Sequence, residues 1–167
     1  MKLSKITVII LFMITIVSCS KNDNEAQRNE ILELKDEFDQ LRRNEELVRN
    51  FYQEFFGDLK IEAAANKYLG DVYIQHNPNL GDGREELIEK AKIWFKGKEP
   101  FTVDVRRVFA SGDYVFIHTK GKGGKHDKGV SVMDVFMVKN NKLIEHWDTM
   151  QDIPEKAANN HPFFREL

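Results

Sequence analysis

The 167-residue sequence predicts an α+β domain in which helices come first and then cover one face of a curved, mostly antiparallel sheet. Two observations predict this arrangement. Apolar residues recur every three or four positions between Ile31 and Phe56 and again between Leu87 and Phe95, which is the period of a helix. After Pro100 the period changes to two, and short turn-forming segments separate the strand candidates. Helices followed by strands favour an α+β fold over alternating β–α units.

Residues 1–18 have the layout of a signal peptide. Lys2 and Lys5 precede an apolar run from Ile6 to Val17. Spanning a bilayer takes about 20 apolar residues, so this run is too short for a transmembrane helix and suits an export signal. We therefore expect an exported protein.

The only cysteine, Cys19, directly follows this segment. The residues 16–19 resemble a bacterial lipobox, in which the cysteine is lipidated. The resemblance implies a lipoprotein anchored to a membrane through Cys19, on the periplasmic, outer-membrane or cell-surface side, with residues 19–30 as a polar tether. A single cysteine excludes a disulfide framework. With 25 basic and 27 acidic residues there is no positive field for nucleic acid.

The first helical pattern has a wholly polar centre at residues 42–46. This centre predicts either a break or a stretch that leaves the core. We interpret residues 31–44 as a helical stalk or dimer element and residues 45–167 as the compact domain. Two further helices are expected, at residues 61–68 and at 87–95.

One carboxylate stands out among the predicted strands, which cover residues 71–77, 102–110, 113–120, 130–139 and 142–150. On the strand 130–139, alternation places Asp134 on the same face as Val132 and Phe136. A charged carboxylate in apolar surroundings costs several kcal/mol, so it either raises its pKa or finds a partner. Asp134 is therefore the first candidate for a functional residue.

His118, on the preceding strand, is expected to share that face and to pair with Asp134. Such a pair can exchange a proton with a carbonyl compound. The alternative is a buried hydrogen bond that only supports the fold. On the last strand Trp147 is expected to face the pocket, whereas His146 and Asp148 are expected to pair on the back of the sheet.

The sequence indicates no cofactor and no metal. Its histidines form no close ligand pair such as H-x-H or HExxH. The glycine-rich segment 121–129 lacks the closing Gly-Lys-Ser/Thr of a phosphate-binding loop, and no Gly-x-Ser-x-Gly nucleophile motif is present.

The segments 73–78, 133–136 and 142–148 together resemble the SnoaL-like polyketide cyclase branch of the nuclear transport factor 2-like superfamily, over about residues 45–167. The resemblance implies a cone of three helices on a curved sheet that encloses a pocket. It also implies that Asp134 acts as the general acid–base of an aldol-type cyclisation with help from His118, and that no cofactor takes part. The expected pocket residues are Tyr73, His76, Asn77, Phe136 and Trp147.

Three functions remain open from the sequence. The first is a cofactor-independent lyase or isomerase acting on a small hydrophobic carbonyl compound. The second is a lipid-anchored protein that binds a hydrophobic small molecule without turnover. The third is an interaction role, in which the exposed sheet face forms a homodimer.

Overall fold

The computed structural model describes residues 5–98, 100, 102–123 and 128–164, with side chains from residue 24 onward. The side chain of Cys19 lies outside this part, so the signal peptide and the lipid anchor stay predictions. The chain divides into two compact units, Met1–Gln40 and Leu41–Leu167.

Helix α1 (Lys5–Tyr52) is continuous through both units. It runs without interruption through residues 42–46, so of the two alternatives expected there, a break or a stretch that leaves the core, the break is wrong. Residues 19–30, predicted as a tether, are helical as well. Among the described residues, no helix is both long enough and apolar enough to cross a membrane.

In the second unit, three helices pack against an open, mixed sheet of five strands within the described part of the chain, which confirms the α+β prediction. The end of α1 leads through a π-helical turn, η1 (Gln53–Gly57), to α2 (Ile61–Tyr68), and α3 (Arg84–Trp94) follows the first strand. The strands are β1 (Leu69–Gln75), β2 (Thr102–Ser111), β3 (Tyr114–Lys122), β4 (Val130–Lys139) and β5 (Lys142–Asp152).

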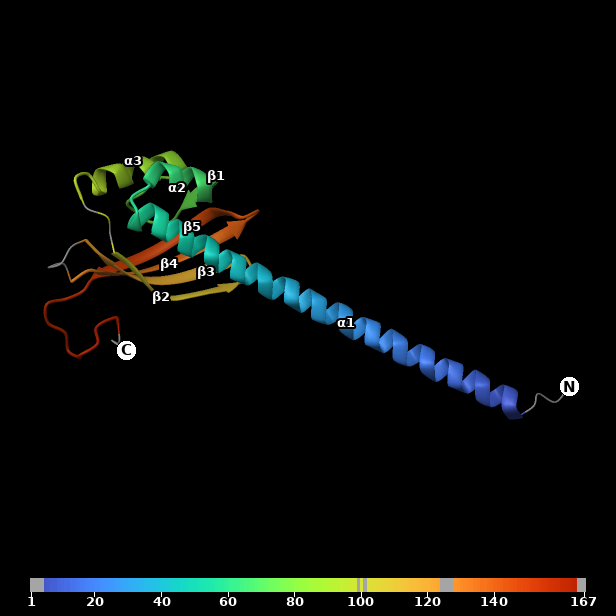
Figure 1. Cartoon of the computed structure of the whole chain (residues 1–167). Coiled ribbons are helices and arrows are strands. Elements are labelled where there is room, and N and C mark those ends of the chain that lie inside the picture. Colours follow the sequence, from blue (N-terminus) through green and yellow to red (C-terminus); the bar gives the residue numbers. More distant parts are fainter. Residues whose placement is uncertain (1–4, 99, 101, 124–127, 165–167) are drawn as a thin grey trace. The chain divides into compact units, whose positions relative to one another are not determined.

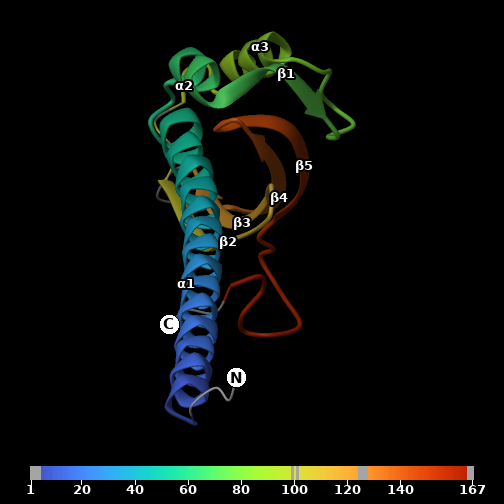
Figure 2. The same ribbon diagram turned by 90° about the vertical axis from the view of Figure 1, so that its right-hand side faces the viewer.

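The strands lie in the order β1-β5-β4-β3-β2 (Figure 1). Strand β1 runs parallel to β5, and the other pairs are antiparallel. Figure 2 shows that β2 to β5 follow one strong curve, with α2 and α3 beside β1. A curved sheet covered by helices leaves room for a pocket on its concave face.

The core joins this concave face to the last turns of α1. Phe51 and Phe55, four positions apart on one face of the helical segment, are completely buried and their ring centroids lie 5.1 Å apart. Phe51 also meets Phe136 of β4 at 5.8 Å, edge to face. The aromatic stripe seen in the sequence is therefore core packing.

A bulge in β5 decides which of its side chains face the pocket. Strands β4 and β5 turn at Asn140 and Asn141, both with positive φ, and the register then shifts near Ile144, which has no partner of its own. A side chain on Gly70 would approach Ile144 Cγ2 to 3.0 Å, so glycine leaves space beside the bulge. Because one extra residue reverses the alternation, His146 and Leu143 both face inward, although they are three positions apart.

Candidate active site

A cavity of about 570 Å³ opens between the concave face of the sheet and the helices of the second unit. Its wall is mostly apolar and includes Phe56, Leu87, Phe95 and Val132. Five polar residues of the wall carry the chemistry described below or adjoin it: Tyr52, Asn77, Asp134, His146 and Asp148. Pockets that are apolar with a few placed polar groups are typical of small-molecule sites.

Asp134 lies at the inner end of this polar group, with 4% of its surface exposed. Its Oδ2 accepts a hydrogen bond from the Tyr52 hydroxyl, and its Oδ1 lies 2.8 Å from His146 Nε2. Burial raises the pKa of the Asp134 carboxyl, and the nearby Asp148 adds to this, whereas His146 and Tyr52 oppose it. The isolated carboxylate expected from the sequence has thus acquired two partners.

The tautomer of His146 follows from its contact with Gln75. The Asn77 backbone N–H donates to Gln75 Oε1 at 2.9 Å, and because an N–H can only donate, the atom it meets must be the carbonyl oxygen. The same oxygen lies 2.9 Å from His146 Nδ1, so Nδ1 carries a proton and donates. One further proton is then shared between His146 Nε2 and Asp134 Oδ1, and either group can hold it.

Asp148 is the second carboxylate of the site. It lies directly opposite Asp134 in the β4–β5 register, on the same face of the sheet. The Asn77 amide donates to both of its oxygens at 2.8 Å, which fixes the carboxylate toward the cavity. Two carboxylates with different surroundings and different partners therefore line one end of the pocket.

The same residues are candidates for holding a cation. Donor atoms of Asp134, His146 and Asp148 lie within 4.8 Å of one another. However, Asp134 and His146 already bond to each other, and Asn77 contacts both oxygens of Asp148. Every one of these donor atoms thus already has a protein partner, and the arrangement fits proton transfer better than metal coordination.

His118, predicted as the partner of Asp134, lies on the opposite face of the sheet. In the β3–β4 register Ile117 faces Asp134, whereas His118 faces Met133. A shift of one residue reverses every side chain, so the predicted Asp134–His118 pair does not form. His118 is instead buried beneath the ring of Phe164, with centroids 4.8 Å apart.

The contacts of His118 also exclude a role as a base toward Ser131. The Arg107 guanidinium, which can only donate, lies 3.1 Å from His118 Nδ1. The remaining nitrogen, Nε2, therefore carries the proton and donates to Ser131 Oγ at 3.0 Å. Burial lowers the pKa of His118, and the charges of Arg107 and Arg106 add to the effect.

Trp147 and His76, both expected at the pocket, lie on the outer face. Their rings stack 4.5 Å apart, and His76 Nε2 lies 2.7 Å from Glu145 Oε1. The bulge at Ile144 is the physical reason, since it turns Trp147 outward and brings His146 and Asp148 in. The expectation that these last two pair on the back of the sheet is wrong as well.

The other expected pocket residues lie in or next to the site. Asn77 lines the cavity. Tyr73 and Phe136 are buried behind it, where the Phe136 ring stacks on His146 at 4.5 Å and the Tyr73 ring lies parallel to it at 6.3 Å. Burial raises the pKa of Tyr73, so its hydroxyl stays neutral. Both residues support the imidazole rather than contact the cavity.

Sequence reasoning missed Tyr52 and Gln75 and misplaced His146 and Asp148. The H-x-D pattern of residues 146–148 was a usable signal, because positions two apart on a strand share a face. Tyr52 offered no such signal, since its spacing matches that of the core residues around it.

A family model describing a SnoaL-like domain matches residues 48–146, which is more than half of the chain. The chain belongs to the SnoaL-like family. No curated protein sequence matches it. The cone fold inferred from the resemblance is confirmed, since solved structures with this architecture superpose on the SnoaL-like chain.

Three of these structures illustrate the range of the fold. A candidate polyketide cyclase from Acidithiobacillus ferrooxidans has 21% identity and a TM-score of 0.54, covering 65% of this chain and 87% of its own. An epoxide hydrolase from Mycobacterium tuberculosis has 17% identity and a TM-score of 0.54, covering 67% and 85%. A candidate ketosteroid isomerase from Kribbella flavida has 14% identity and a TM-score of 0.56, covering 76% and 91%. At these identities the likeness concerns the fold.

Proposed function

We propose that the SnoaL-like domain is a cofactor-independent enzyme that enolises a small hydrophobic carbonyl compound, as a lyase or isomerase of the cyclase type. The observation that carries this proposal is the buried Asp134–His146 hydrogen bond, which faces an apolar cavity with Asp148 opposite. Two carboxylates in unlike environments are a common basis for separate acid and base roles. Structural neighbours named as a cyclase and an isomerase support the same class of reaction.

Each group has a definite part in the proposed reaction. Asp148 removes a proton from the carbon next to the carbonyl, and the Asp134–His146 pair gives its shared proton to the carbonyl oxygen. One proton enters the protein and one leaves it, so the product is the neutral enol. That enol then attacks a second carbonyl or regains a proton at another carbon. Tyr52 stabilises Asp134 in its ionised state through the hydroxyl contact.

The wall of the cavity supports a hydrophobic substrate. Side chains such as Leu80, Trp94, Val103 and Met150 surround the polar end. Burying apolar surface contributes about 25 cal/mol per Å², so an aliphatic or aromatic ring system would bind here through its contact area. The carbonyl oxygen would be oriented by the polar end.

Deuterium exchange tests the proposal without knowledge of the product. A panel of small cyclic and aromatic ketones is incubated with the chain in D₂O, and deuterium uptake next to the carbonyl is followed by NMR. We expect Asp148→Asn and Asp134→Asn to slow the exchange by about 10²- to 10⁴-fold, the usual contribution of a positioned acid or base.

His146→Gln and His118→Gln form the sharpest comparison, because they are buried imidazoles on opposite faces of the sheet. The proposal requires loss of exchange with His146→Gln and retention with His118→Gln. The reverse result would contradict the proposed site. If the wild-type chain binds ketones but exchanges none of them, it is a binding protein without turnover.

We further propose that the protein is exported and attached to a membrane by a lipid on Cys19, and that it forms a homodimer through the outer face of its sheet. The signal layout of residues 1–18 supports the first point. Exposed Phe109, Tyr114 and Met133 on the outer face support the second. Labelling with a radioactive fatty acid should be lost in Cys19→Ser.

A further inference from the structure

Helix α1 carries an apolar stripe that continues beyond the second unit. Its members are Ile31, Leu34, Phe38 and Leu41, spaced by three, four and three residues. Ile31, Leu34 and Phe38 have 64%, 59% and 59% of their surface exposed. This spacing is that of the a and d positions of a heptad repeat, the seam along which two helices pack in a coiled coil.

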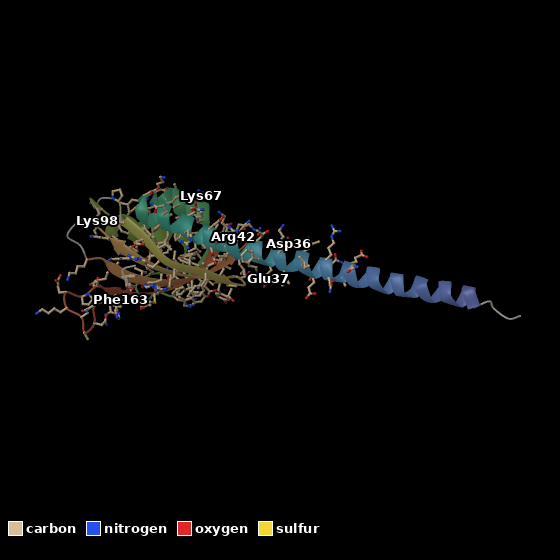
Figure 3. All side chains as sticks on the ribbon, turned by 60° about the horizontal axis from the view of Figure 1, so that its bottom comes forward. Asp36, Glu37, Arg42, Lys67, Lys98 and Phe163 are labelled. Atoms are coloured by element: carbon tan, nitrogen blue, oxygen red, sulfur yellow. The ribbon has the colours of Figure 1, made fainter. Side chains whose placement is uncertain are left out.

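The charges beside the stripe are sorted by sign. With Ile31 and Phe38 at a, and Leu34 and Leu41 at d, the e positions on one side hold only basic residues and the g positions on the other only acidic ones. The basic residues are Arg28, Lys35 and Arg42, and the acidic residues are Asp23, Glu30 and Glu37. In Figure 3, Glu37 and Arg42 are labelled on α1. These are the positions whose charges set partner choice and orientation in coiled coils.

Pairing within the helix does not explain the acidic row, although each of the three basic residues has an acidic residue three or four positions away. Neither Glu30 nor Glu37 has a basic residue three or four positions away in either direction, the spacings at which helical side chains meet. A membrane surface would attract the basic side and repel the acidic side. The pattern instead suits a partner that presents the same two rows of charge.

We propose that a second copy of this chain binds along this stripe, so that residues 24–42 of α1 form a parallel, in-register, two-stranded coiled coil. In a parallel pair each g position meets the next e position of the other helix, five residues further on. Glu30 then meets Lys35 of the partner subunit, and Glu37 meets Arg42 of the partner subunit. In an antiparallel pair g would meet g and e would meet e, which would bring like charges together.

The seam residues favour the same arrangement. A β-branched residue at a with leucine at d, as in Ile31 with Leu34, favours two strands in parallel coiled coils. Asn24 occupies the preceding a position, where asparagine fixes register and oligomeric state. Only four apolar residues contribute per chain, so the dimer should dissociate on dilution. The proposal is independent of the proposed enzyme activity.

Disulfide formation tests the geometry on the full chain in detergent micelles. Cys19→Ser removes the natural thiol, and a new cysteine is placed either at the seam, Leu34→Cys, or on the far side of the helix, Asp36→Cys (Figure 3). A symmetric bond needs Cα atoms about 4.4–6.8 Å apart, which only the seam position meets in a parallel, in-register pair. We expect Leu34→Cys to form the disulfide dimer at least ten times faster. Equal rates, or no dimer at Leu34→Cys, would overturn the proposal.

Charge exchange provides the second test. The variant Glu30→Lys/Glu37→Lys and the variant Lys35→Glu/Arg42→Glu, each combined with Leu34→Cys, should form the seam disulfide more slowly, because like charges then face each other. An equal mixture of the two should recover the rate, since opposite charges meet again. Because the disulfide reports only the seam of α1, a dimer made by the sheet does not affect this readout, and unchanged rates in both variants would also overturn the proposal.

Discussion

The raised pKa of Asp134 can be tested by measuring how the free energy of unfolding of the variant Tyr52→Phe depends on pH. The Tyr52 ring is buried against Phe56 and Phe136, with centroids at 5.0 and 6.3 Å, and phenylalanine keeps these contacts. Only the hydroxyl that donates to Asp134 Oδ2 is lost. The hydroxyl also has a hydrogen bond with the Thr119 side chain, but that bond joins neutral groups, so the pH-dependent part of the loss reports the bond to Asp134.

The cost of that loss should depend on pH. A hydrogen bond to a charged group contributes about 1.5–3 kcal/mol, and one between neutral groups about 0.5–1.5 kcal/mol. Because burial raises the pKa of Asp134 and the Tyr52 contact opposes this, the variant should have a still higher pKa at Asp134. Its native state then holds a proton to higher pH than the wild type does, and its stability relative to the wild type falls as pH rises.

Urea unfolding followed by tryptophan fluorescence from pH 4 to 8 measures this difference. We expect the destabilisation to grow with pH above about 4, the ordinary carboxyl value. Tyr68→Phe is the matched control, because the hydroxyl on the buried ring of Tyr68 also donates to a carboxylate, that of Glu54, at 2.7 Å. Glu54 is also bound by Lys67, and these contacts lower its pKa, so this variant should show a constant cost above about pH 5. A Tyr52→Phe cost that stays flat or falls with pH would refute the reasoning.

Three further outcomes are expected. Burial and two arginines lower the pKa of His118, so the native state binds fewer protons than the unfolded chain below about pH 6.5. The free energy of unfolding should therefore fall as pH drops below that value, and it should fall less in His118→Gln. Urea midpoints measured across this pH range would show the difference. Phe51→Ala should lower the free energy of unfolding by about 3–5 kcal/mol, since the ring is buried in the core. Gln75→Met should slow ketone exchange about 3- to 10-fold with unchanged ligand affinity, because His146 Nδ1 loses its hydrogen-bond acceptor. An unchanged exchange rate would show that the contact with Gln75 does not position His146.

The fold was largely predictable because it depends on periodicity within each segment. The helical period up to Phe95 and the alternation after Pro100 gave the layers and the order of the elements. The same alternation singled out Asp134, since one carboxylate among valines and a phenylalanine needs a special environment whichever strands lie beside it. Such inferences need only one strand at a time.

The partner of Asp134 depended on register between strands, which alternation within one strand does not determine. His118 would share the face of Asp134 if the β3–β4 pairing were shifted by one residue, and the long connection between these strands leaves that shift open. Between β4 and β5 the two-residue turn at Asn140 and Asn141 does fix the starting register.

The bulge at Ile144 then reverses that starting register. If Ile144 were instead paired in a regular ladder, Leu143 and Trp147 would share the inner face and His146 would point outward. The Trp147 indole would then line the pocket. With the bulge, the imidazole of His146 and the carboxylate of Asp148 lie beside Asp134. The bulge takes up one residue of β5 and thereby separates an aromatic binding pocket from an acid–base site. Deleting Ile144 removes the bulge but keeps Glu145 opposite Met137 and Asp148 opposite Asp134, so ketone exchange should persist in this variant. Loss of exchange from an intact sheet would contradict the assigned register.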